Sequence, residues 1–301
     1  MQKKKLLISL LVSLAAFGRL SAAAHPADDV IGSYAGELSY AGQIEPYITG
    51  LFALSALEHG RDADKVRAFI EWYFANLNYP DRYNINATIY VYERDGEDLS
   101  PSYAYDSIDG YSGLFLHLLL RYAKATGDLS IVSDNWQKVE DTAYTIALLQ
   151  EGDGLTIALI TTNQKYLMDN CEAYGGISAY IELRKLMGLP PSPSYENIRA
   201  GIKRGIMKRM YRKKDRIFVH TIENDIVEDA DWNTYYPDAY AQLFPIYYDL
   251  LEDNPDLAKQ LWRYFSEKHA ANENSFPVEQ RAMFQLTRNK ARAKYPDLFP
   301  K

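Results

Sequence analysis

The chain has 301 residues, of which 47% are hydrophobic, and 33 Lys and Arg face 40 Asp and Glu for a net charge of -7. This acidic balance argues against nucleic acid and strongly anionic polysaccharides as partners, because like charges repel. A single cysteine, Cys171, leaves no internal disulfide, so the hydrophobic core must hold the fold together. Neutral or cationic partners are expected.

The first 24 residues predict a secretory signal peptide. Lysines at 3–5 precede an apolar stretch over 6–17, and small residues follow up to Ala24. This stretch is shorter than the ~20 residues that cross a bilayer, so no stable membrane anchor is expected after cleavage. Cleavage removes four basic residues, which leaves a net charge of about −11. We expect residues 25–301 to form a single periplasmic or secreted domain.

An internal repeat of about 64 residues organises the rest of the chain. Four segments carry an acid, any residue and a tyrosine ahead of a helix-like apolar pattern, and successive acids are 64, 63 and 66 residues apart. The four pairs are Glu45 and Tyr47, Asp109 and Tyr111, Glu172 and Tyr174, and Asp238 and Tyr240. The second and third copies share a longer string, DSIDGYSGL and DNCEAYGGI, which chance does not readily supply.

Each copy continues in the same way. Apolar residues at three- and four-residue spacing predict second helices over 62–77, 130–150, 194–211 and 254–269. The last of these is expected to begin with Asn254 as N-cap and Pro255 at the first helical position. Short strand-like segments follow in three copies, over 87–98, 154–167 and 216–228. A final helix over about 277–293 opens a fifth unit.

Repeated helical hairpins must pack side by side, because each hairpin buries only one stripe of each helix. An open solenoid and a ring both satisfy this requirement. The first helices are the more apolar and contain Gly50, Gly113, Gly175 and Gly176, small residues that suit a crowded inner layer. We therefore predict an all-α fold, an (α/α) helical-hairpin toroid that is a complete or partial (α/α)6 barrel, with short β-hairpin excursions.

In such a ring the inner helices run the same way, so their N-termini gather around one mouth. The acids and tyrosines of the repeat would line it, with Asp106, Asp169 and Trp232 just above. Carboxylates among aromatic rings suit a neutral sugar, since rings cover its C–H faces and acids accept hydrogen bonds from its hydroxyls. The expected substrate-binding residues are Glu45, Tyr47, Tyr111, Tyr174, Trp232, Asp238 and Tyr240. No metal and no cofactor are predicted.

Five segments carry a resemblance to a known superfamily. They are EPY (45–47), TIYVY (88–92), YDSIDGYSGLFLHLLLRYAKATGD (105–128), YLMDNCEAYGG (166–176) and DADWNTYYPDAY (229–240). In these the chain resembles the six-hairpin, (α/α) toroid glycosidases, and specifically exported bacterial proteins of that group. The resemblance implies glycoside hydrolysis by paired carboxylates. The sequence predicts about nine strong helices, whereas a full toroid has twelve, so closure of the ring stays open.

Glycosidic cleavage needs one carboxylic acid and one carboxylate, ~5 Å apart in retaining and ~6.5 to 9.5 Å apart in inverting enzymes. Asp109 and Glu172 are the first candidates for this pair, and Asp106 and Asp169 are the next. Each acid could equally serve as a helix cap or first-turn acid, as in a capping box from Asp169 to Glu172. The tyrosines could equally be core residues, and Trp232 a loop anchor.

The leading hypothesis is a glycoside hydrolase that acts on a neutral or weakly charged polysaccharide or oligosaccharide. A non-catalytic carbohydrate-binding or envelope-polysaccharide assembly protein would retain the same acids and aromatic residues. A polysaccharide lyase fits less well, because such enzymes use cationic groups to neutralise a uronate and arginines are scarce near the repeats.

Overall fold

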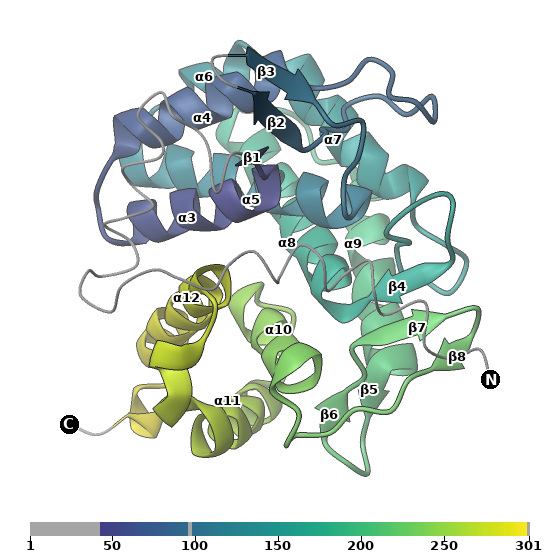
Figure 1. Cartoon of the computed structure of the whole chain (residues 1–301), viewed down its shortest axis with the longest axis vertical. Coiled ribbons are helices and arrows are strands. Elements are labelled where there is room, and N and C mark those ends of the chain that lie inside the picture. The colour runs from purple at the N-terminus through teal and green to yellow at the C-terminus, as the bar shows by residue number, and fades with distance from the viewer. Residues whose placement is uncertain (1–42, 96–97, 300–301) are drawn as a thin grey trace.

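The computed structural model describes residues 43–95 and 98–299 (Figure 1). The predicted signal peptide at 1–24, and the residues up to 42 that follow it, lie outside the described part of the chain.

Long helices alternate between two layers, as the repeat predicts. The first helices of the units are α3 (Pro46–Glu58), α5 (Ile108–Thr126), α8 (Leu167–Leu186), the short α10 (Leu243–Tyr247) and α12 (Val278–Lys294). The second helices are α4 (Ala63–Ala75), α7 (Trp136–Leu148), α9 (Pro193–Gly205) and α11 (Pro255–His269). Between them lie α6 (Ser130–Ser133), the π-helical turns η2 (Ile206–Met210) and η3 (Tyr235–Ala239), and the 3-10 turns η4 (Ala270–Ser275) and η5 (Pro296–Leu298).

The first helices curve around a common centre. Helix α3 packs on α5, α5 on α8, α8 on α10, and α10 on α12, and α12 returns to contact α3 (Figure 1). This arrangement confirms the predicted (α/α) toroid rather than an extended solenoid. Within residues 43–95 and 98–299, however, the helices do not build a complete six-hairpin barrel.

In the described part of the chain, three small antiparallel sheets lie against the helices. One has the order β1 (Gln43–Ile44), β2 (Tyr92–Asp95) and β3 (Asp98–Pro101), and another the order β4 (Gln164–Tyr166), β7 (Thr221–Glu223) and β8 (Ile226–Val227). Strands β5 (Tyr211–Arg212) and β6 (Ile217–Phe218) form the third. The second predicted excursion does not form a hairpin of its own, because β4 pairs with β7 from the next repeat. Within the predicted third segment, a tight turn at Asn224 and Asp225 joins β7 to β8, with both residues at positive φ.

The helix starts agree with the sequence in part. Asn254 caps α11, its side chain accepting a hydrogen bond from the Leu257 N–H at 3.3 Å, with Pro255 at the first helical position as predicted. Helix α8 instead begins at Leu167 with Tyr166 in the N-cap position, so Asp169 is not a cap. The interpretation of Asp169 and Glu172 as a capping box is therefore wrong.

The fourth first helix is broken. Its residues form the turn η3, which includes Pro237, and then only five residues of α10, around Pro245. Tyr236 inside η3 has extended backbone angles (φ −121°, ψ 132°), as expected for a residue that precedes a proline. Prolines lack the N–H that an uninterrupted helix needs, which explains why this repeat departs from the pattern of the others.

Helices α5 and α8 touch through their backbones. A Cβ atom on Gly113 would lie 2.4 Å from the Glu172 carbonyl carbon, and one on Gly176 would lie 2.5 Å from the Gly113 Cα. No larger residue fits at either position unless the two helices move apart. The prediction that small residues allow close packing of the inner layer is confirmed at this crossing.

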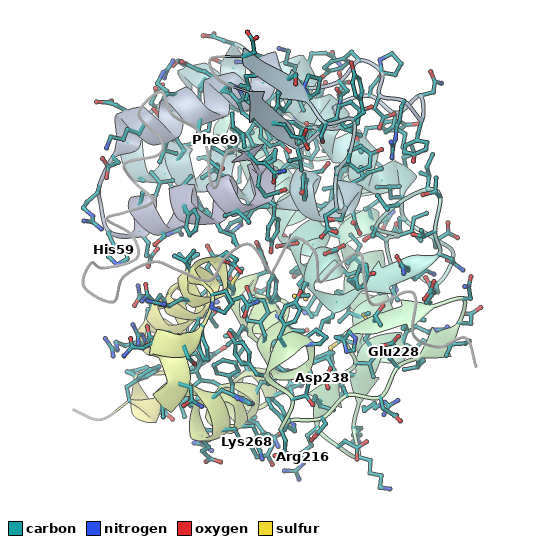
Figure 2. All side chains as sticks on the ribbon, in the orientation of Figure 1. His59, Phe69, Arg216, Glu228, Asp238 and Lys268 are labelled. Atoms are coloured by element: carbon teal, nitrogen blue, oxygen red, sulfur yellow. The ribbon has the colours of Figure 1, made fainter. Side chains whose placement is uncertain are left out.

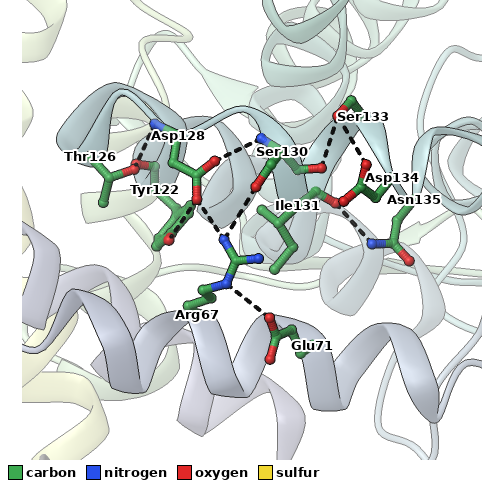
Figure 3. A network of polar contacts seen from close by, with 10 residues as sticks. All are labelled: Arg67, Glu71, Tyr122, Thr126, Asp128, Ser130, Ile131, Ser133, Asp134 and Asn135. Atoms are coloured by element: carbon green, nitrogen blue, oxygen red, sulfur yellow. Dashed lines mark hydrogen bonds and ion pairs between the residues drawn. The ribbon is translucent and has the colours of Figure 1, made fainter.

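A polar network ties the first two units together on the outside (Figure 3). The Arg67 guanidinium of α4 donates to Asp128 at 2.5 Å and to Glu71 at 2.9 Å. Asp128 in turn accepts from the Ser130 N–H at 2.8 Å, where α6 begins. Because solvent screens these groups, the network contributes little to stability and mainly fixes the α5–α6 connection against α4.

No helix among the residues that the structure describes is both long enough and apolar enough to cross a membrane.

The α5–α8 crossing yields a prediction for stability. Gly113→Ala and Gly176→Ala should each lower the free energy of unfolding by about 2–3 kcal/mol, because the added methyl group meets backbone atoms that cannot turn away. Gly152→Ala is the matched control, since a Cβ there meets nothing within 4 Å, and it should change stability by no more than about 0.5 kcal/mol. Urea denaturation measures all three, and equal stability of Gly113→Ala and Gly152→Ala would contradict the close packing.

Candidate functional site

The α5–α8 crossing brings three carboxyl groups together. Asp109 lies in the first turn of α5, while Asp169 and Glu172 lie near the start of α8. A Cβ atom placed on Gly110 would lie 2.9 Å from Glu172 Oε2 and 3.3 Å from the Asp169 Cγ. Both carboxyl groups of α8 therefore lie against the turn of α5 that carries Asp109.

Asp109 is completely buried but has hydrogen-bond partners. The Thr156 hydroxyl donates to Asp109 Oδ2 at 2.5 Å, and the Gly110 N–H donates to Oδ1 at 2.9 Å. Burial raises the pKa of Asp109 to about 7, although both hydrogen bonds act in the opposite direction. The carboxyl thus exchanges its proton near neutral pH.

Glu172 is completely buried, and neither of its carboxyl oxygens has a hydrogen-bond partner of acceptable geometry in the described part of the chain. Burial raises its pKa well above the ordinary range, while the nearby Tyr47 hydroxyl opposes the shift weakly. A buried carboxylate without a partner is costly. The surroundings of Glu172 therefore favour its protonated, neutral form.

Asp106, Asp169 and Glu45 are the members of the cluster that solvent reaches. Asp169 is half-buried, and its pKa is raised well above the ordinary range by burial and then by the charges of Asp109, Glu172 and Asp106. The side chain of Asp106 is exposed, yet desolvation still raises its pKa. Accessibility combined with desolvation is typical of a carboxyl on the floor of a depression.

Glu45 joins the cluster from α3. It is the N-cap of that helix, accepting from the Tyr47 N–H at 3.3 Å, and it also accepts from the Tyr111 hydroxyl of α5. Burial raises the pKa of Glu45 to about 7, and the charge of Asp106 adds to the shift. The first acid and the second tyrosine of the repeat are thus joined across neighbouring helices.

Tyrosines surround the carboxyl groups. The pKa of Tyr47, of Tyr240 and of Tyr248 is raised by burial, with the charge of Glu172 a contributing cause for each. The pKa of Tyr166 and of Tyr236 is likewise raised by burial, with further contributions from Asp106 and Asp169. The phenols and the acids therefore occupy one shared region.

The cluster has no cationic partner among the residues at 43–95 and 98–299. Their ion pairs include none of the carboxyl groups of Glu45, Asp106, Asp109, Asp169 and Glu172. In the same residues no group of His, Cys, Asp and Glu side chains is arranged to hold a metal ion. Burial raises the pKa of these carboxyl groups, and the charges of neighbouring acids add to the shift for Glu45, Asp109, Asp169 and Glu172.

Three predicted residues lie apart from the cluster. Tyr174 lies among Glu252, Arg199 and other charged groups at the far side of α8, because residues two apart do not share a helix face. The Trp232 ring packs edge-on against Tyr264 with ring centroids 5.3 Å apart, as a loop anchor would.

Asp238 has partners of its own. It accepts from the Asp231 N–H at 2.9 Å, and His220 Nδ1 lies 2.7 Å from its Oδ1. His220 also faces Glu228 at 3.2 Å, and Figure 2 places Glu228 and Asp238 on neighbouring elements. Asp238 is therefore engaged in a separate His–carboxylate group.

The structure adds residues that the sequence reasoning missed. Thr156 contacts the cluster through its hydrogen bond to Asp109, and burial and then the acids of the cluster raise the pKa of Tyr166 and Tyr236. Besides burial, the charge of Glu279, in the first turn of α12, contributes to the raised pKa of Tyr235, Tyr236 and Tyr240. The sequence could have indicated Glu279, because it is an acid at the start of the predicted fifth unit. The acid-x-Tyr pattern could not find it, because Arg281 stands where the tyrosine would be.

The fold of this chain is similar to that of several known proteins. No protein-family model and no curated protein sequence matches the chain. Among solved structures, a GH76 α-mannanase from Bacteroides thetaiotaomicron is similar at a TM-score of 0.56 and 10% identity, over 90% of this chain and 77% of that one.

Two further structures are similar to this chain. A rhamnosidase from Klebsiella oxytoca with rhamnose bound has a TM-score of 0.55 and 11% identity, over 91% of this chain and 55% of its own. A cellobiose 2-epimerase from Bacillus thermoamylovorans has a TM-score of 0.50 and 13% identity, over 75% of this chain and 61% of its own. The chain therefore shares its (α/α) toroid fold with these three structures.

Proposed function

We propose that the protein is a glycoside hydrolase whose reaction takes place at the carboxyl cluster between α3, α5 and α8. The observation that carries the proposal is the convergence of five acids from successive repeats with no cation beside them. Such a cluster costs stability, so its presence is best explained by chemistry that needs protonated and ionised carboxyl groups side by side. Glycoside hydrolysis is the reaction that uses this pair of states.

Accessibility divides the roles within the cluster. A group that transfers a proton to the substrate must touch it, and Asp106, which is exposed, and Asp169, which is half-buried, both meet this requirement beside the other acids. Glu45 is half-buried too, but its carboxyl group already accepts hydrogen bonds from the Tyr47 N–H and the Tyr111 hydroxyl. Asp169, with its strongly raised pKa, is the general acid, and the more exposed Asp106 is the base or nucleophile. Asp109 and Glu172 lie behind them as positioning residues that keep Asp169 protonated.

The substrate class follows from the chemistry of the site. Carboxyl groups without cations disfavour uronates, and tyrosine rings suit the C–H faces of sugars. The similar α-mannanase and rhamnosidase act on neutral sugars by name, which supports a neutral or weakly charged polysaccharide or oligosaccharide. The predicted signal peptide supports action in the periplasm or outside the cell, without a stable membrane anchor.

A non-catalytic carbohydrate-binding or envelope-polysaccharide assembly protein is the second candidate. It is favoured by the complete burial of Asp109 and Glu172, the two acids at the centre of the cluster. Binding of a glycan without release of reducing ends would establish this reading instead.

Replacing the accessible acids should abolish hydrolysis. Asp106→Asn and Asp169→Asn should each lower kcat/KM by about 10²-fold or more, because each removes a proton-transfer group. Reducing-end release from a panel that includes α-mannan and rhamnosides measures the loss. Asp229→Asn is the control, since its side chain is 98% exposed. Full activity of both variants would remove the assignment.

Asp109 should influence the pH dependence of kcat/KM. Its charge contributes to the raised pKa of Asp169, so Asp109→Asn should move the alkaline limb of kcat/KM to lower pH. Asp229→Asn should leave that limb in place. An unchanged alkaline limb in active Asp109→Asn enzyme would show that Asp109 has no influence on the general acid.

The cluster should also make stability depend on pH. The folded pKa of Asp109, about 7, lies above its unfolded value, so the folded protein binds the extra proton and stability falls as pH rises towards 7. The free energy of unfolding from urea denaturation should be greater at pH 5 than at pH 8, by on the order of 3 kcal/mol. Asp109→Asn should flatten this dependence. A protein equally stable at both pH values would contradict the raised pKa.

A further inference from the structure

A cavity of about 300 Å³ lies where the fourth and fifth units meet. Its lining includes Tyr235 and Tyr236 of η3, His269 at the end of α11, and Phe276 and Gln280 near the start of α12. The volume is at the lower end of the range for small-molecule sites. It has room for a single small ring and not for a long chain.

The cavity contains polar atoms that lack partners. Gln280 is only 5% exposed, and its Oε1 has no hydrogen-bond partner in the described part of the chain. The Tyr235 hydroxyl is buried and unpartnered in the same way. Unpartnered buried polar groups are rare in folded proteins, since each costs roughly 1–3 kcal/mol. A ligand with hydroxyl groups would satisfy both.

The rest of the lining is aromatic. The rings of Tyr235 and Phe276 stack with centroids 4.4 Å apart, and His269 lies 5.6 Å from Tyr235. These contacts hold the wall rigid before any ligand arrives. Flat apolar surface with a few fixed polar atoms matches a sugar ring, which has C–H faces and hydroxyl edges.

Tyr236 connects the cavity with the acids. It lines the cavity, and its pKa is raised in part by the charges of Asp106, Asp169 and Glu279. Tyr236 is therefore the residue that would connect a sugar in the cavity with the carboxyl cluster. The position is that of a neighbouring sugar unit in the same chain.

We propose that this cavity is a subsite for one neutral sugar unit of the substrate, held by the aromatic wall and by hydrogen bonds to Gln280 and Tyr235. The inference rests on the proposed function for its connection to cleavage, but binding in the cavity stands on its own geometry. A uronate is disfavoured, because Glu279 and the carboxyl cluster would repel its charge.

Calorimetric titration of the full chain tests the proposal. The probes are methyl α-mannoside, rhamnose and cellobiose, with glucuronate as the charged comparison. At least one neutral sugar should bind, and glucuronate should bind more weakly. Gln280→Met and Tyr236→Ala should each raise Kd about tenfold or more, because they remove a hydrogen-bond acceptor and a ring face. Tyr144→Ala is the matched control, since Tyr144 is 61% exposed on α7, and should change Kd less than twofold.

Thermal melting separates binding from folding. Gln280→Met replaces an unpartnered amide with an apolar side chain of similar length. The melting temperature should therefore stay the same or rise, while binding of the sugar is weakened. A large fall in melting temperature would show that Gln280 has a structural role and would overturn its assignment to the ligand. Failure of every neutral sugar to bind, or an unchanged Kd in both variants, would overturn the subsite.

Hydrolysis and cavity binding fail independently. Loss of binding in Gln280→Met and Tyr236→Ala, in a protein that hydrolyses no glycan, would leave the subsite standing and reject the hydrolase. Hydrolysis that depends on Asp106 and Asp169 but is insensitive to both cavity substitutions would support the hydrolase and reject the subsite.

Discussion

The direct backbone contact between α5 and α8 is the constraint on which the site depends. Gly113 and Gly176 have no side chains, so the two helices approach until Gly113 meets the backbone of Glu172. At that separation the carboxyl groups of Asp169 and Glu172 lie against the turn of α5 that carries Asp109. The carboxyl groups are close because the glycines are there.

This proximity determines the chemistry of the acids. Burial and mutual repulsion both disfavour the ionised form, and the available hydrogen bonds oppose them only in part. Asp109 has the help of Thr156 and Gly110, whereas Glu172 has almost none, so two neighbouring acids differ in their hold on a proton. One cluster can thus present an acid and a base at the same pH, which is the requirement for acid–base catalysis at a glycosidic bond.

The sequence predicted the framework because the framework is periodic. An acid recurring about every 64 residues marks successive first helices, and the structure brings Glu45, Asp109 and Glu172 together as that period implies. The period could not say where each helix begins. Helix α8 starts five residues before Glu172, which moves that acid into the second turn and turns Tyr174 away. The local partners Thr156 and Tyr166 come from connecting segments that have no repeat.

The fourth unit shows why the departures from the repeat matter. Pro237 and Pro245 interrupt its first helix, so the chain leaves the inner layer where a regular helix would have filled it. The cavity lies at this interruption, and Tyr236, held in extended backbone before Pro237, lines it. The periodic units therefore gather the carboxyl groups, and the irregular unit supplies the space in which a sugar could be held.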